Sequence, residues 1–93
     1  MSQLVLFMGD SPLLLENVQR DEGGRVLSGD VVNGAWHLRL SSGRYGAYTS
    51  ANAKTPVNKF STSPEEVVEV AVPAAVKGDY NSVIDWAMEH RAK

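Results

Sequence analysis

The sequence predicts a small α+β domain: an antiparallel sheet of three to four strands, joined as a hairpin meander, packs against a C-terminal helix and a short helix that precedes it. Short apolar runs separated by glycine-containing turns predict the strands, and apolar residues at helical spacing predict the last helix. The chain has 93 residues, 43% of them hydrophobic, which suits a single domain over residues 1–93. Strands are expected near residues 3–8, 25–32, 35–41 and 44–49.

The N-terminal third begins with a strand signal. The apolar run at residues 4–8 ends at a Gly-Asp turn. The Ser-Pro pair that follows is favoured at a helix start and predicts a short helix over residues 13–18, although an extended segment fits this stretch nearly as well. The stretch DEGG at residues 21–24 predicts a turn.

A hairpin is expected at Asn33 and Gly34, because a type I′ turn needs positive φ at both positions. Folding the chain there places apolar residues opposite each other on one face and polar residues on the other. We therefore expect the apolar face, which includes Trp36, to be buried. The apolar pairs are Val31–Trp36, Gly29–Leu38 and Leu27–Leu40, and the polar pairs are Asp30–His37 and Ser28–Arg39.

The stretch SSGRYGAYT, residues 41–49, turns the chain back again. A two-residue loop would place Tyr45 on the apolar face and Tyr48 on the polar face, whereas a three-residue loop would exchange them. In either case one tyrosine joins the core. The other is expected to meet solvent beside Arg39 or Arg44.

The C-terminal half is expected to hold a loop and two helices. Residues 50–62 are polar and predict a loop, with Val57 or Phe60 as its inward anchor. The SPEE stretch that follows predicts a capped short helix ending at Pro73, while the β-branched run VVEVAV leaves a strand as the alternative. A final helix is expected over residues 80–91. Its buried stripe comprises Tyr80, Val83, Ile84, Ala87 and Met88.

The charges are unevenly distributed along a chain whose net charge is −2. Residues 1–30 carry five acids against two bases, and residues 65–93 carry six acids against three bases. The segment between them, residues 31–64, holds no acid. Its basic residues are Arg39, Arg44, Lys54 and Lys59, which predict a local anion-binding surface between two acidic flanks.

Little in the sequence suggests catalysis. The absence of cysteine excludes disulfides, thiolate zinc sites and a cysteine nucleophile, and fits a cytoplasmic protein. Asp30 opposite His37 is half of a general-base arrangement, but no nucleophile is placed beside it, so we expect an exposed polar pair. His37 and His90 lack metal-ligand spacing, and no cofactor or metal is expected. The N-terminal run is too short for a signal peptide or a membrane span.

The GRYGAY stretch has a mechanism available for nucleic-acid binding. Gly46 leaves a strand position without a side chain, which lets a flat ring approach the backbone. Tyrosine faces stack on unpaired bases, and arginine and lysine hold phosphates. The expected nucleic-acid-binding residues are Arg39, Arg44, Tyr45, Tyr48, Lys54 and Lys59.

The run LRLSSGRYGAYTS resembles the C-terminal repeats of type IA DNA topoisomerases, which carry a glycine, basic or polar, aromatic, glycine, proline, aromatic signature at a strand turn. The resemblance covers residues 36–72, with Ala47 where the family usually has proline. It implies a four-stranded antiparallel sheet crossed by a helix, which binds single-stranded DNA without cleaving it. The residues that match the signature are Gly43, Arg44, Tyr45, Gly46 and Tyr48.

The function expected from these features is non-enzymatic binding, first of single-stranded nucleic acid. The alternative is a protein-interaction module, a small inhibitor or adaptor, that uses the acidic flanks. A small hydrolase built on Asp30 and His37 is the third hypothesis. Convergence of the basic residues on one surface would favour nucleic acid, and convergence of carboxylates would favour a protein partner.

Overall fold

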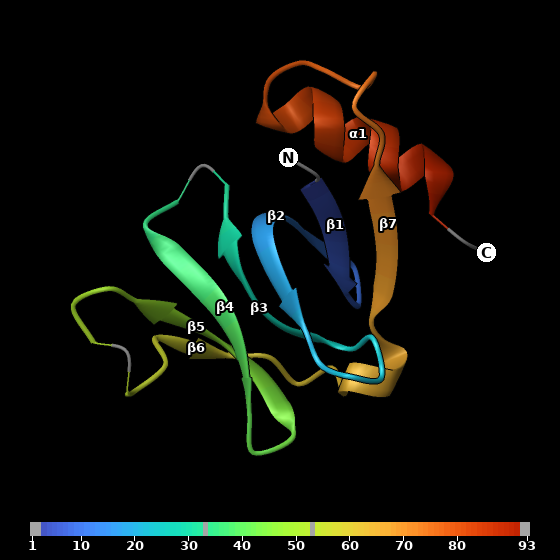
Figure 1. Ribbon diagram of the computed structural model, residues 1–93. Coiled ribbons are helices and arrows are strands. Elements are labelled where there is room, and N and C mark those ends of the chain that lie inside the picture. The colour runs from blue at the N-terminus through green and yellow to red at the C-terminus, as the bar shows by residue number, and fades with distance from the viewer. Residues whose placement is uncertain (1–2, 33, 53, 92–93) are drawn as a thin grey trace.

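The computed structural model describes residues 3–32, 34–52 and 54–91. Within these residues one antiparallel sheet has the strand order β6-β5-β4-β3-β2-β1-β7, and a single α-helix follows it in the chain (Figure 1). The elements are β1 (Gln3–Met8), β2 (Ser11–Arg20), β3 (Val26–Val31), β4 (Trp36–Ser41), β5 (Arg44–Thr49), β6 (Asn58–Lys59), the 3₁₀ turn η1 (Pro64–Glu66), β7 (Val68–Val72) and α1 (Tyr80–His90). The α+β class is confirmed, but the expected three to four strands understate a sheet of seven.

Strand β2 occupies the stretch where a short helix over residues 13–18 was expected, so that prediction is wrong. A tight turn with Gly9 at φ 64° brings β2 back along β1, and all six residues of β1 pair with it. Leucines at positions 13–15 thereby gain apolar neighbours on both faces of the sheet. Tertiary pairing outweighs the local helix-start signal of the Ser-Pro pair.

The helix expected after residue 63 is also absent. Only the 3₁₀ turn η1 forms, and Ser63 donates its hydroxyl to the Glu66 carboxylate rather than capping a helix. The β-branched residues beyond it form β7, which pairs along β1 from Phe7–Val68 to Gln3–Val72. The alternative of a strand is therefore the correct one, because β1 offers an open edge to a run of residues with high β-propensity.

The two central hairpins have the predicted register. Strands β3 and β4 pair Ser28 with Arg39 and Asp30 with His37, although residue 33 of the expected turn lies outside the described residues. The β4–β5 loop has two residues, Ser42 at φ 54° and Gly43 at φ 77°, which is the type I′ pattern. The turn at residues 21–24 is confirmed as well, closed by the Gly24 amide, which donates to the Asp21 carbonyl.

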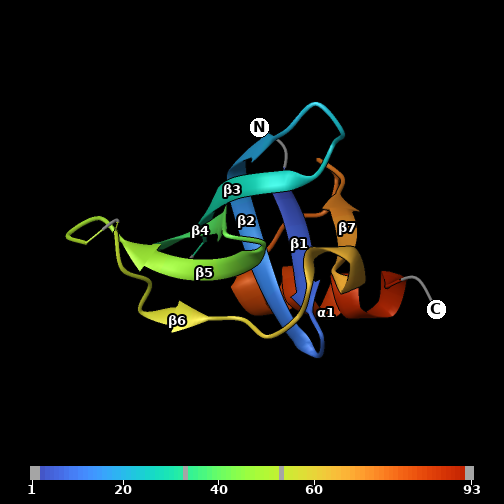
Figure 2. The ribbon, with the colours of Figure 1, turned by 90° about the horizontal axis from the view of Figure 1, so that it is seen from below.

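The sheet is strongly curved, and it separates two hydrophobic cores (Figure 2). Strand β2 is bent at Asn17, where a positive φ coincides with a break in the β2–β3 register. The curvature lets side chains of β3, β4 and β5 meet those of β1 and β2 on the face opposite α1. The helix core contains Val5, Phe7, Leu14, Val70, Val72, Val83, Ile84 and Ala87, and the curved-sheet core contains Leu4, Leu6, Met8, Leu15, Val26, Leu38 and Tyr45.

Several residues expected in the core lie at the surface. Trp36 is 43% exposed and Leu27 is 38% exposed, although their pairing register is as predicted. Helix α1 packs on β2 and β7 and does not extend over the beginning of β4, so the side chain of Trp36 is left without a covering layer. Met88 is also exposed rather than part of the helix stripe, whereas Trp86 contributes to the helix core.

Candidate functional site

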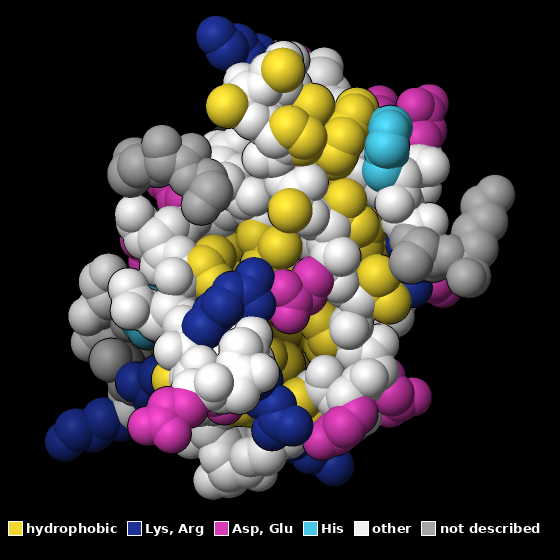
Figure 3. All heavy atoms as spheres, turned by 45° about the vertical axis from the view of Figure 1, so that its right-hand side comes forward, with side chains coloured by type: hydrophobic (Ala, Val, Ile, Leu, Met, Phe, Trp, Pro, Cys, Tyr) yellow, Lys and Arg dark blue, Asp and Glu magenta, His cyan; other side chains and the backbone are white. Residues whose placement is uncertain are grey.

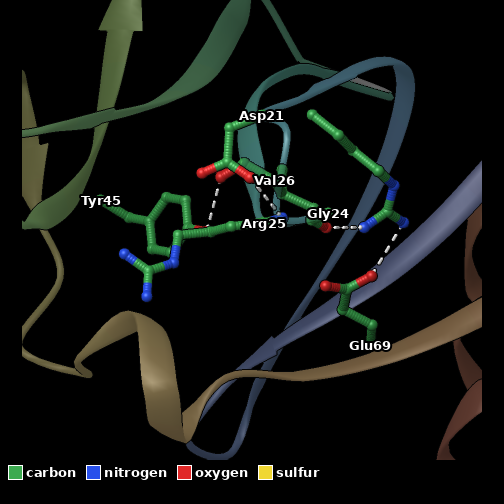
Figure 4. A network of polar contacts seen from close by, with 7 residues as sticks. Asp21, Gly24, Arg25, Val26, Tyr45 and Glu69 are labelled. Carbon is green, nitrogen blue, oxygen red and sulfur yellow. Dashed lines mark hydrogen bonds and ion pairs between the residues drawn. The ribbon is translucent and has the colours of Figure 1, made fainter.

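Tyr45, an expected base-stacking residue, is part of the curved-sheet core. Its side chain is 2% exposed, and its hydroxyl donates a 2.7 Å hydrogen bond to the Val26 carbonyl (Figure 4). Burial raises the pKa of the Tyr45 hydroxyl, with a smaller contribution from the charge of Glu69. This tyrosine fixes β5 to β3 and presents no ring face to a ligand.

Tyr48 lies on the polar face, as a two-residue loop requires, but it is only 4% exposed. The guanidinium carbon of Arg39 lies 4.1 Å from its ring centroid, and the His37 ring stacks beside it at 5.8 Å. A Cβ placed on Gly46 would lie 3.1 Å from Pro56 and 3.2 Å from the Tyr48 ring. The chain's own side chains therefore fill the space expected for a base, and the prediction of a solvent-facing tyrosine is wrong.

The predicted basic residues are partly brought together. Arg39, Gly46 and Lys59 are successive partners across β4, β5 and β6, so Arg39 and Lys59 share the outer face of the sheet. Arg44, two residues before Gly46 on β5, shares that face too. Lys54 is exposed in the following loop, where its backbone amide donates to the side-chain oxygen of Asn52.

Some carboxylates of the acidic flanks are neutralised within the chain. Arg20 contacts Glu69 at 2.8 Å and also donates to the Gly24 carbonyl, while Arg25 contacts Glu65 at 3.4 Å (Figure 4). Figure 3 shows acidic and basic side chains interspersed over the lower part of the face that it presents, with hydrophobic side chains gathered towards the helix. These paired acids do not form a strong field of one sign.

A surface that was not expected from the sequence lies around Trp36. A cavity of about 270 Å³ is lined by Leu13, Val31, Val32, Gly34, Trp36 and Tyr80, and we call it the apolar cavity. It lies where the β3–β4 connection approaches the first turn of α1 (Figure 1). Leu13 and Val31 belong to the edge of the curved-sheet core, and Val32 and Tyr80 to the edge of the helix core. The two cores thus meet at an opening beside an exposed indole.

A second cavity of about 440 Å³ adjoins the same tryptophan, and we call it the polar cavity. Its polar lining comes from Glu16, Asp30, His37 and Ser50, and it shares Trp36 and the β3–β4 connection with the apolar cavity. The two cavities together are called the Trp36 groove. The groove is continued towards α1 by a hollow lined by Val32, Asp79, Tyr80 and Asn81.

Carboxylates from both acidic flanks meet along this line. Glu16 and Asp30 are direct cross-strand partners on β2 and β3, and Asp79 caps α1 at its far end. The backbone amide of Ser82 donates to the Asp79 carboxylate and lowers its pKa, so this group stays ionised. Asp30 accepts a 3.0 Å hydrogen bond from the Asn17 side chain. Within the described residues neither Glu16 nor Asp30 forms an ion pair.

The polar cavity has none of the bonding of a hydrolytic site. Asp30 and His37 are opposed as predicted, and Ser50 lines the same cavity, but no hydrogen bond among the described residues joins His37 to either. A catalytic triad requires both of these bonds. In the same part of the chain, no group of three or more potential metal ligands lies close enough to hold an ion, and no helix is long and apolar enough to cross a membrane.

One signal in the sequence bears on the Trp36 groove. The predicted hairpin register already placed Trp36 opposite Val31 and Asp30 opposite His37, and the structure preserves the second of these pairs. What the register does not contain is the position of α1, which decides whether the tryptophan is covered. Comparison with protein-family models, with curated proteins and with solved structures found no match, so the resemblance to topoisomerase repeats stays a prediction.

Proposed function

We propose that this domain is a non-enzymatic protein-interaction module, a small adaptor or inhibitor, that holds a segment of its partner in the Trp36 groove. The observation that carries the proposal is the 43% exposure of Trp36 at the wall of an apolar cavity. Tryptophan and tyrosine dominate the binding energy of protein interfaces, particularly where they line a pocket that a partner side chain can fill. Both residue types line this cavity.

The arrangement of the two cores supports an apolar anchor in the partner. The cavity walls are edges of cores that are otherwise closed, so a leucine- or phenylalanine-sized side chain would extend both. Burial of both tyrosines removes the stacking surface on which the nucleic-acid hypothesis depended. Convergence of Glu16 and Asp30 from the N-terminal acidic flank with Asp79 from the C-terminal flank is the pattern expected for a protein partner.

A peptide-display selection tests this function. The intact domain is immobilised and challenged with a library of random dodecapeptides, and selected peptides are synthesised and titrated. Trp36→Ala should weaken their binding by about 30-fold or more, the effect of losing a central aromatic contact. Val57→Ala is the matched control, because Val57 is also exposed, at 59%, but lies outside the groove. Failure to select any peptide, or equal binding by the Trp36 variant, would contradict the proposal.

A second candidate keeps single-stranded nucleic acid as the ligand, and the shared face of Arg39, Arg44 and Lys59 favours it. Binding there would use phosphate contacts rather than stacking. In a titration of single-stranded DNA over a range of salt concentrations, Arg44→Ala should reduce the salt slope by about 0.7, the value for one phosphate contact. Salt-independent binding, or no binding at micromolar protein, would eliminate this candidate.

A further inference from the structure

We infer that the polar cavity binds a cationic side chain, arginine or lysine, of the segment whose apolar anchor fills the neighbouring cavity. This inference rests on the proposed function, and it specifies the chemistry of the partner: an apolar residue beside a basic one. Three observations carry it: an opposed pair of carboxylates, an aromatic wall, and the absence of a chain cation in the lining.

The carboxylate pair is unfavourable in the isolated domain. Glu16 and Asp30 face each other directly across β2 and β3, and like charges at directly opposed positions destabilise a sheet. Asn17 donates one hydrogen bond to Asp30, which satisfies one oxygen without neutralising the charge. A guanidinium or ammonium group between the two carboxylates would replace repulsion with two attractive contacts.

The aromatic wall adds a second reason to prefer an organic cation. Trp36 lines both cavities, and indole is the aromatic group that attracts cations most strongly. His37, on the other side of Asp30, already stacks on Tyr48, which fixes the outer limit of the cavity. No lysine or arginine is among the described residues that line the polar cavity.

A bound metal ion fits this cavity poorly. Two carboxylates and an imidazole line it, yet they do not form a group close enough to hold an ion. A side chain of several atoms, with its charge spread over a flat guanidinium, can span opposed carboxylates and lie against the indole at once. The volume of about 440 Å³ is ample for such a side chain.

Small-molecule probes test the inference without knowledge of the partner. N-acetyl-arginine amide and its uncharged analogue N-acetyl-citrulline amide are titrated into the intact domain, and the indole NMR signal of Trp36 is followed. A Trp86→Phe variant assigns the two tryptophan signals. The arginine compound should shift the Trp36 signal saturably, with an affinity about threefold or more above that of the citrulline compound.

Glu16→Gln is the decisive variant, because it separates a binding role from a structural one. It should abolish the preference for arginine over citrulline while leaving the thermal midpoint equal or higher. Glu22→Gln, at an exposed position in the turn at residues 21–24, should change neither. Equal affinities for the two compounds in the wild-type domain, or an unchanged preference in Glu16→Gln, overturn the inference.

Failure of this inference is distinguishable from failure of the proposed function. If selected peptides depend on Trp36 but tolerate replacement of every basic residue by citrulline or norleucine, the apolar docking stands and the cation site falls. If the arginine compound binds as expected but no peptide is selected, the cation site stands and the protein-interaction function falls.

Discussion

The guanidinium of Arg39 lies over the ring of Tyr48 at 4.1 Å, so two residues from adjacent strands occupy each other's binding surface. Cation–π contacts of this kind contribute about 0.5–1 kcal/mol at exposed sites and more where water is excluded. The pair thereby removes from solvent both an aromatic ring and one of the basic residues expected to bind a ligand. It turns a candidate recognition element into part of the fold.

Tyr48→Ala should therefore destabilise the domain by about 3–5 kcal/mol, the usual cost of removing a buried aromatic ring. Urea denaturation followed by circular dichroism measures this change. Tyr48→Phe is the control and should retain most of the stability, because the ring and its contacts remain. An alanine variant as stable as the wild type would mean that the ring is free in solution, as a stacking platform requires.

Tyr45→Phe should cost about 1–3 kcal/mol, because it leaves the buried Val26 carbonyl without its hydrogen bond. It should also change the pH dependence at the alkaline end. Burial raises the pKa of Tyr45 above that of an unfolded tyrosine, so its contribution is complete below the unfolded value of about 10 and is lost as pH rises through the folded pKa. Urea unfolding between neutral and alkaline pH should show a steeper loss of stability in the wild type than in Tyr45→Phe.

Trp36→Ala should cost only about 1 kcal/mol, well below the value for a buried tryptophan, because the indole is largely outside both cores. Thermal denaturation of the variant used in the peptide selection provides the measurement. A loss of 3–5 kcal/mol would show that the indole closes the core in solution. In that event the loss of peptide binding in this variant would reflect unfolding.

Asp79→Ala should lower the thermal midpoint, since its carboxylate accepts the amide of Ser82 at the start of α1. Asp79→Ser should restore most of the loss. Because the fold lowers the pKa of Asp79, the carboxylate stabilises α1 above the unfolded pKa, and this contribution disappears as pH falls through the folded value. Midpoints of the wild type and Asp79→Ser should therefore converge at acidic pH, and a constant difference would contradict the assignment.

Local signals predicted the parts of the fold that depend on local geometry. The register of β3 with β4 and the two-residue loop before β5 follow from turn chemistry and cross-strand matching. The final helix follows from apolar spacing and the cap at Asp79. These features need no knowledge of where the rest of the chain lies.

The remaining features depend on contacts between distant segments. Strands β2 and β7 carry helix-start signals, and pairing with β1 overrides them. Burial of Tyr48 requires the loop after β5 to fold back, which it does when Val57 and Phe60 donate their backbone amides to Ala47 and Tyr45. The Trp36 groove exists because α1 stops short of β4. No local pattern contains that information.

The position of β1 between β2 and β7 has a consequence for biosynthesis. Phe7 pairs with Val68, so the first strand to leave the ribosome cannot complete its pairing until more than sixty further residues have been made. Until then the strand presents apolar side chains on both faces, since alternate residues serve alternate cores. Contacts of such long sequence separation slow folding. The nascent chain is therefore most prone to aggregate before β7 emerges, and a hairpin with β2 is its only early protection.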